Sequence, residues 1–198
     1  MVKKLQALRA KKGFTLVELI VVIAIIGVLA AILVPTLSSQ IQNAKVTSCD
    51  TTASKLIDEL NNYIATYTNN GGAYVTTACS VTIDVSSGSP TLGGFSATVY
   101  GDTAVTSKCG TFDEMIQEDM TFKSDGHAEI YIDSNGKAYA AWYCESATKP
   151  ATVGFSKDTS GAVIPAFSFK AKKPGIDAGN GIVVGTSPKV GGTGTELA

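Results

Sequence analysis

The stretch that decides the fold reads Lys11-Lys12-Gly13-Phe14-Thr15-Leu16-Val17-Glu18, and apolar sequence follows it as far as Val34, with Pro35 next. Residues 14–34 form an almost purely apolar run of 21 residues, which is long enough to cross a bilayer as a helix. Glu18 lies near the start of this run, where an ionised carboxylate costs several kcal/mol on the way to the bilayer interior. Because a plain anchor has no use for this carboxylate, the sequence predicts that Glu18 has a partner.

The charges of the chain are divided at Phe14. Five of the 16 Lys and Arg residues precede it, whereas all 17 acidic residues follow it, so the chain after Gly13 has a net charge of −6. The basic residues 1–13 are typical of the cytoplasmic flank of an inserted segment. A cleavable secretory signal is disfavoured, because the apolar run is too long and no small-x-small site closes it. The acidic remainder gives no electrostatic basis for direct nucleic-acid binding.

Helical periodicity continues well beyond Pro35, and the sequence Asn69-Asn70-Gly71-Gly72 is a strong helix stop. We therefore expect one helix from Phe14 to about Thr68, roughly 80 Å long at 1.5 Å per residue. It is apolar all round before Pro35 and amphipathic after it. Pro35 predicts a kink, or alternatively the end of the membrane helix. The apolar stripe of the second half comprises Ile41, Val46, Cys49, Ala53, Leu56, Ile57, Leu60, Ile64 and Tyr67.

Alternating apolar residues and turn sequences predict an antiparallel sheet in the rest of the chain. The clearest signal is a hairpin of residues 128–133 and 137–144 around Asn135-Gly136. Weaker strands are expected at 74–77 and 80–85, in a second hairpin at 152–157 and 162–170, and in an edge strand at 182–184. Thr111 is a candidate N-cap of a short helix that reaches about Met120. The predicted fold class is α+β, a long N-terminal helix packed on a C-terminal antiparallel sheet.

The segment Lys12-Gly13-Phe14-Thr15-Leu16-Val17-Glu18-Leu19 resembles the processing and assembly motif of type IV pilins and pseudopilins. The resemblance implies that a prepilin peptidase cuts between Gly13 and Phe14 and methylates the amine of Phe14. It also implies that Glu18 pairs with the free N-terminus of a neighbouring subunit, and Pro35 matches a proline of the family motif. The chain then divides into a cleaved leader (1–13), a membrane and filament-core helix (14–35) and a globular head (36–198) that includes the second half of the helix.

By this resemblance the protein is a structural subunit, first anchored in the cytoplasmic membrane and then polymerised into an extracellular homo-oligomeric filament for adhesion, motility or DNA uptake. An assembly ATPase and an inner-membrane platform are implied as partners, because the chain has no energy-converting motif of its own. Two alternatives stay open: a pseudopilin of a type II secretion or competence system, and a minor adhesive tip pilin. An ordinary membrane-anchored surface protein is a third and simpler interpretation.

The four cysteines, in a chain with an export segment, predict two disulfides. Four cysteines allow three pairings. Since Cys49 lies on the apolar stripe, we expect Cys49–Cys79 and Cys109–Cys144.

Side chains with catalytic or metal-binding potential are sparse. We expect neither an enzyme nor a cofactor, because nucleotide-binding, nucleophile-elbow and zinc motifs are missing from the sequence. A metal site is disfavoured, since no closely spaced ligands occur. Asp133-Ser134-Asn135-Gly136 resembles part of a calcium loop, but a hairpin turn is the simpler interpretation. His127 is expected to be structural, and Trp142 and the tyrosines are expected to pack in the sheet.

Overall fold

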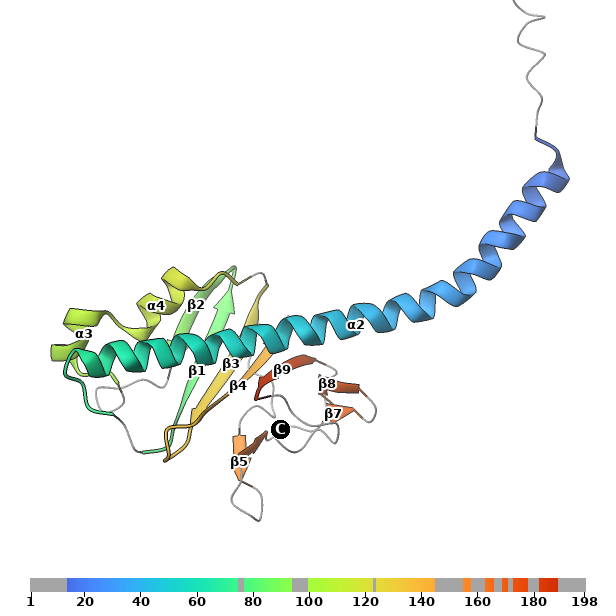
Figure 1. Cartoon of the computed structure of the whole chain (residues 1–198). Coiled ribbons are helices and arrows are strands. Elements are labelled where there is room, and N and C mark those ends of the chain that lie inside the picture. The colour runs from blue at the N-terminus through green and yellow to red at the C-terminus, as the bar shows by residue number, and fades with distance from the viewer. Residues whose placement is uncertain are drawn as a thin grey trace, which may run out of the picture. The chain divides into compact units, whose positions relative to one another are not determined.

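The computed structural model describes residues 14–74, 77–93, 100–122, 124–144, 155–157, 163–165, 169–170, 173–177 and 182–188. The chain forms two compact units, Met1–Gln42 and Asn43–Ala198. One helix, α2 (Leu16–Asn69), begins in the first unit and ends in the second. Figure 1 shows this helix followed by a mostly antiparallel β region with two short helices. The predicted α+β fold class is confirmed.

The helix α2 agrees closely with the predicted helix. It continues through Pro35, so the alternative that the helix ends at this proline is wrong. At its C-terminus Gly71 adopts a φ of 93°, and the Gly72 amide donates to the carbonyl of Tyr67 at 3.0 Å. This left-handed conformation favours glycine and explains why the Asn-Asn-Gly-Gly sequence stops the helix.

The second unit contains a sheet with the strand order β2-β1-β3-β4-β9-β8-β7, and its neighbouring strands pair antiparallel. A separate pair, β5 and β6, forms a second small sheet. The bounds are β1 (Cys79–Ser86), β2 (Ser89–Gly93), β3 (Gly126–Ile132), β4 (Ala138–Cys144), β5 (Phe155–Lys157), β6 (Val163–Pro165), β7 (Phe169–Lys170), β8 (Lys173–Asp177) and β9 (Val183–Ser187).

The predicted hairpin is confirmed as β3 and β4, with Gly126 opposite Cys144 and Ile132 opposite Ala138. Its turn is held by Asp133, whose Oδ1 accepts from the amides of Asn135 at 2.8 Å and Lys137 at 2.9 Å. Gly136 takes a φ of 79° there. The carboxylate of Asp133 thus serves the turn, as the hairpin interpretation requires.

Two short helices follow β2 in the chain, α3 (Thr103–Cys109) and α4 (Phe112–Asp119). The prediction of α4 is confirmed in detail, because Thr111 and Glu114 form a capping box that satisfies backbone donors at its start. The helix α3 and the strand β2 were not predicted. For the strand expected at 74–77, Tyr74 and Thr77 lie outside β1, and residues 75–76 are not among the described ones.

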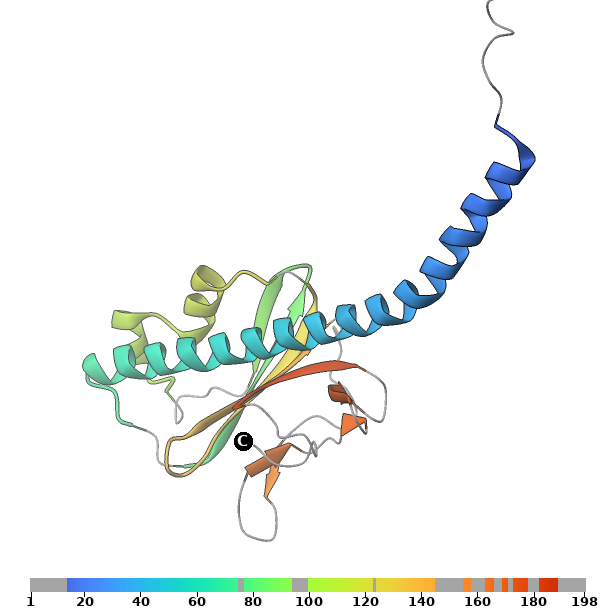
Figure 2. The same ribbon diagram turned by 45° about the vertical axis from the view of Figure 1, so that its right-hand side comes forward.

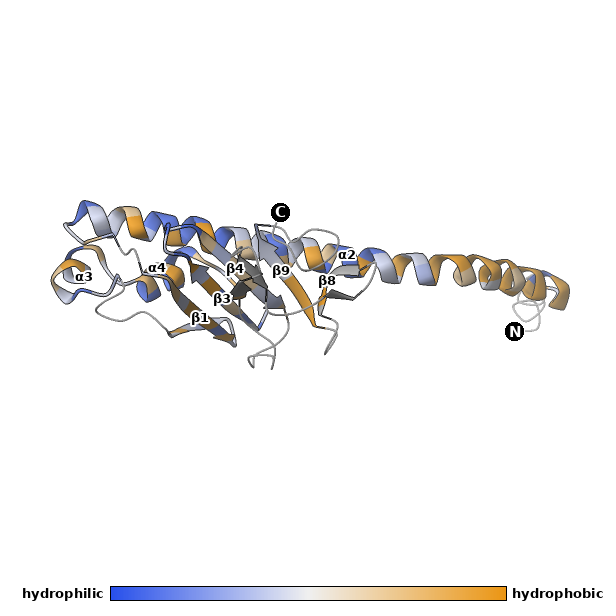
Figure 3. Ribbon diagram, turned by 90° about the horizontal axis from the view of Figure 1, so that it is seen from below, coloured by the Kyte–Doolittle hydropathy of each residue, from blue (hydrophilic) through white to orange (hydrophobic). Residues whose placement is uncertain are grey.

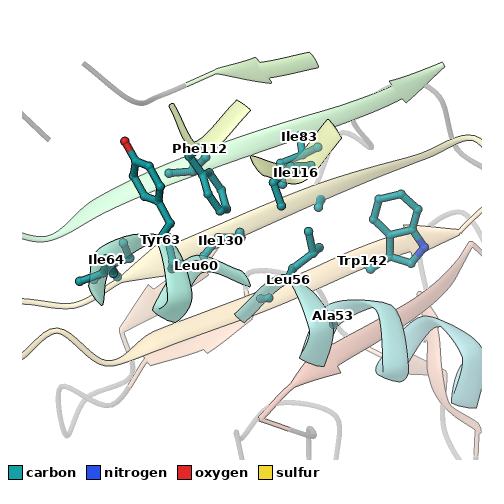
Figure 4. Packing of buried hydrophobic residues seen from close by; sticks show 14 of the residues in the cluster. Ala53, Leu56, Leu60, Tyr63, Ile64, Ile83, Phe112, Ile116, Ile130 and Trp142 are labelled. Carbon is teal, nitrogen blue, oxygen red and sulfur yellow. The ribbon is translucent and has the colours of Figure 1, made fainter. Parts of the chain in front are cut away.

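The hydrophobic core of the second unit lies between the C-terminal half of α2 and one face of the sheet (Figure 2). Figure 4 shows Leu56 and Leu60 of α2 beside Ile116 of α4 and Ile130 of β3. From Cys49 onward the residues of the predicted stripe are buried except Ile57, which is partly buried; Val46 is partly buried and Ile41 is exposed. A smaller cluster on the opposite face joins Ala141, Tyr143 and Val184 to Phe155 and Ile182.

The strand β9 passes very close to α2. A Cβ at Gly185 would lie 1.9 Å from the backbone carbon of Cys49, so only glycine fits. Next to it, the amide of Thr186 donates to Asp50 Oδ1 at 3.0 Å. The predicted edge strand at 182–184 is therefore corrected: β9 lies inside the sheet, between β4 and β8.

Candidate functional site

The first candidate site is the exposed apolar part of α2 in the first unit. This helix is long and apolar enough to cross a membrane, judged by length and composition. Figure 3 colours this part of α2 almost entirely as hydrophobic. Its valine, leucine and isoleucine side chains are all exposed. A monomeric soluble protein does not expose such a continuous apolar surface, so lipid or other protein must cover it.

Glu18 lies at the N-terminal end of this surface, in a capping box with Thr15. The Thr15 hydroxyl accepts from the Glu18 amide at 3.2 Å. In return, Glu18 Oε2 accepts from the Thr15 amide at 2.8 Å and from the Thr15 hydroxyl at 2.7 Å. This arrangement satisfies backbone donors at the helix start. It also fixes the carboxylate at the first turn of α2, and both bonds from Thr15 go to Oε2.

Thr15 is a hydrogen-bond partner of Glu18 that the sequence interpretation missed. The sequence Thr15-Leu16-Val17-Glu18 has the T-x-x-E spacing of a capping box directly before an apolar run, so a local signal was present. Phe14 precedes it as the first described residue and is 86% exposed. Gly13 and the rest of the predicted leader lie outside the described residues, so the predicted cut between Gly13 and Phe14 stays a prediction.

Small residues recur along the same apolar surface. Ala24, Gly27, Ala30 and Ala31 are all exposed, and nothing lies within 4 Å of a Cβ added at Gly27. Gly27 and Ala31 have the spacing of a small-xxx-small pair, which lets two helices approach closely.

Pro35 is the remaining feature of the predicted assembly segment. It lies within α2, where it removes one backbone donor. The Thr36 hydroxyl donates to the carbonyls of Leu33 at 2.9 Å and Ile32 at 3.2 Å, so the adjacent turn has an additional hydrogen-bond donor. The predicted kink stays a prediction.

The disulfide of the second unit joins Cys49 of α2 to Cys144 of β4, with a Cα–Cα distance of 6.2 Å. Both predicted pairings are therefore wrong, and Cys79 and Cys109 are free thiols. The sheet register gives the reason. Cys79 is level with Ile132 and Ala138, six residues along β4 from Cys144, which is about 20 Å at 3.3 Å per residue. Because Cys79 and Cys144 lie at opposite ends of the strands, Cys49 can be near only one of them, and it is bonded to Cys144.

The remaining candidate residues, His127 and Cys79, have contacts that indicate structural roles. His127 is buried on β3 and bonds through Nδ1 to the Asp84 carboxylate on the neighbouring strand, which agrees with the structural role predicted for it. Burial raises the pKa of the Cys79 thiol, which keeps this sulfur in its unreactive form. Across the described residues, no cluster of three His, Cys, Asp or Glu side chains could hold a metal ion.

Comparison with known proteins adds two findings to this geometry. The model of the prokaryotic N-terminal methylation motif matches residues 8–34. A fimbrial protein of Moraxella nonliquefaciens is 45% identical over 67 residues, which cover 34% of this chain and 41% of the relative. The match thus spans less than half of the relative's length. No solved structure matched the chain.

Proposed function

This chain has the N-terminal segment of a type IV pilin-family protein, and we propose that it is the structural subunit of a type IV pilus. The observation that carries the proposal is the exposed apolar surface of α2 with Glu18 held at its first turn. Membrane lipid covers this surface in the precursor, and neighbouring helices cover it in the filament. Gly27 and the nearby alanines let these helices pack closely, and van der Waals contact supplies most of the cohesion.

Processing supplies the partner that Glu18 requires. Cleavage between Gly13 and Phe14 frees an α-amino group at Phe14, which then carries the methyl group. Phe14 and Glu18 differ by four residues, or about 6 Å along a helix axis. In a bundle, the amine of one subunit therefore reaches the Glu18 carboxylate of another when the two helices are suitably staggered.

This pairing sets the register of the filament. An unpaired carboxylate in a low-dielectric bundle is strongly penalised, whereas a paired and hydrogen-bonded one is tolerated. The Thr15 hydrogen bonds support this pairing, since they hold the Glu18 carboxylate in one position. The penalty for a wrong stagger, rather than the attraction itself, thus selects the correct one.

The same proposal implies further proteins. A prepilin peptidase makes the cut, and an assembly ATPase with an inner-membrane platform moves subunits from the membrane into the filament. The acidic head then faces the outside of the cell, where the filament supports adhesion, motility or DNA uptake. The subunit itself acts structurally.

The test compares Glu18→Ala with Glu59→Ala in cells that make the filament. Glu59 is a carboxylate of the same helix, in the second unit, and serves as the matched control. We expect Glu18→Ala to be cleaved and methylated at Phe14 yet absent from sheared surface filaments. Mass spectrometry of the mature N-terminus and electron microscopy measure the two steps. Glu59→Ala should pass both.

Two outcomes would contradict the proposal. If Glu18→Ala assembles normally, the pairing with the Phe14 amine does not guide assembly. If the wild-type chain is cleaved but no surface filament consists mainly of it, the pseudopilin and the tip pilin become the better interpretations. An intact Met1 would reject processing altogether.

A further inference from the structure

A pocket of about 200 Å³ opens on the second unit beside α2. One wall is a face of this helix, formed by Ser48, Thr51, Thr52 and Lys55, which lie three and four residues apart. The hydroxyls of Thr51 and Thr52 donate to the carbonyls of Thr47 at 2.9 Å and Ser48 at 3.1 Å. Because their protons are used within the helix, these two oxygens act as hydrogen-bond acceptors toward the pocket.

The facing wall comes from the segment after α4 and carries Thr121 and Ser124. The floor is formed by Phe122 and Trp142, whose rings are stacked at 26° with centroids 5.3 Å apart. Both rings are largely buried, so each gives the pocket only a small apolar edge. In Figure 4 the indole nitrogen of Trp142 points away from Leu56 and Ile116. The sulfur-bearing side chain of Cys144 completes the floor.

The charge of the lining is unusual for this acidic part of the chain. Among the described residues that line the pocket, Lys55 is the only ionisable one and none is a carboxylate. Within the described ranges, Lys55 makes no ion pair. Within this described lining, an amino acid would find no carboxylate partner for its ammonium group, and a phosphate dianion would meet one cation, Lys55. The lining therefore fits a ligand with several hydroxyls and one carboxylate.

The volume limits the size of that ligand. Pockets for drug-sized molecules are roughly 300–1,000 Å³, and this pocket is smaller. One sugar ring fits such a volume. Its hydroxyls donate to Thr51 and Thr52 and exchange hydrogen bonds with Ser48 and Ser124, and its C–H face covers the apolar floor.

We propose that this pocket binds a uronic acid, with the sugar carboxylate on Lys55 and the ring hydroxyls on the threonine and serine side chains. The site belongs entirely to the second unit. Binding there goes beyond the assembly of subunits and does not depend on Glu18. Each head would thus bind an acidic polysaccharide through one of its uronic acid residues.

The experiment uses the fluorescence of Trp142, which is the only tryptophan of the chain and lies in the floor of the pocket. The full chain in detergent micelles is titrated with D-glucuronate at constant ionic strength. We expect a saturable change in emission with a Kd that is roughly millimolar, as a single small ligand permits. D-glucose lacks the carboxylate and acetate lacks the ring hydroxyls, so each should bind at least tenfold more weakly than D-glucuronate.

Lys55→Gln should weaken glucuronate binding about tenfold or more, because it removes the charged hydrogen-bond donor. The matched control is Lys108→Gln in α3, which makes the same charge change outside the pocket and should leave the Kd unchanged. The proposal is overturned if acetate or glucose binds as tightly as glucuronate, if both lysine variants behave alike, or if no saturation occurs. These binding constants are measured on the unassembled chain, so a failure of filament assembly would not affect them.

Discussion

At the scale of single residues, Tyr63 has the most strongly altered environment that can be tested. Its side chain is buried in the core, its hydroxyl donates to the Tyr100 carbonyl at 2.7 Å, and its ring lies 5.4 Å from that of Phe112. Burial, with a smaller contribution from nearby Cys109, raises the pKa of Tyr63 to about 12. The neutral phenol is thus the form that the folded head retains.

A pH dependence follows from this shift. The unfolded state has a tyrosine pKa of about 10, so the stabilisation is fully present below pH 10 and is lost as the pH rises toward 12. Each pKa unit corresponds to about 1.4 kcal/mol of unfolding free energy. We expect urea unfolding of the wild type to weaken between pH 10 and pH 11.5 by more than that of Tyr63→Phe. Equal losses in both proteins would show that Tyr63 is not the group responsible.

Single residues also show which features could be predicted from the sequence. Thr111 and Glu114 were readable as a helix start, and Asn135-Gly136 as a hairpin turn, because each signal lies within four residues. The link between Thr15 and Glu18 is equally local, and the T-x-x-E spacing is sufficient to predict it. The pairing of Cys49 with Cys144 depends on the register of β1, β3 and β4 and on the packing of α2, which no local pattern contains.

At the scale of elements, the disulfide joins α2 to the C-terminal end of β4, the central strand of the sheet, across 95 residues of sequence. Such a long closed loop restricts the unfolded chain strongly. We expect the double variant Cys49→Ser with Cys144→Ser to lose about 2–5 kcal/mol of unfolding free energy in urea. Reduction of the wild type by dithiothreitol should produce a loss of similar size.

The free cysteines provide the control for this prediction. Cys79→Ser and Cys109→Ser change half-buried thiols that form no disulfide, so each should cost under about 1 kcal/mol. The assigned pairing would be wrong if Cys79→Ser or Cys109→Ser destabilised the protein as much as the double variant.

Elements also differ in how far they could be predicted. The long helix was predictable from the apolar run of residues 14–34, the periodic stripe of residues 41–67 and the glycine stop, and β3 and β4 were predictable from their alternation. The helix α3 is only seven residues long with one buried residue, Val105, so its pattern is too weak to read. The position of β9 inside the sheet depends on Gly185 fitting against Cys49, which is a property of the packed structure and not of the strand.

At the scale of the whole molecule, the two units differ in whether their apolar side chains are exposed or buried. The first unit exposes its apolar side chains, whereas the second has its own core and sheet. A protein that begins at Asn43 should therefore stay monomeric without detergent, while the full chain should require it. Analytical ultracentrifugation measures the first property.

The unfolding free energy of the protein that begins at Asn43 should match that of the full chain in micelles within about 1 kcal/mol, since the core residues begin at Cys49. Aggregation of the shortened protein, or a much larger loss of stability, would mean that the apolar unit is needed for the head to fold.

The position of β9 has a consequence for synthesis. The strand that fills the gap beside β4 comes from residues 183–187, which are synthesised well after β4 (Ala138–Cys144). Until β9 has been made, β4 has an open edge that can pair with another chain. Asp50 also has no Thr186 amide to accept from, because that amide lies 136 residues further along the chain. A ribosome that stops early thus releases a head with an unprotected strand. The head can complete its sheet only when β9 has been made, so chains that end before residue 183 become targets for aggregation or proteolysis instead of subunits for a filament.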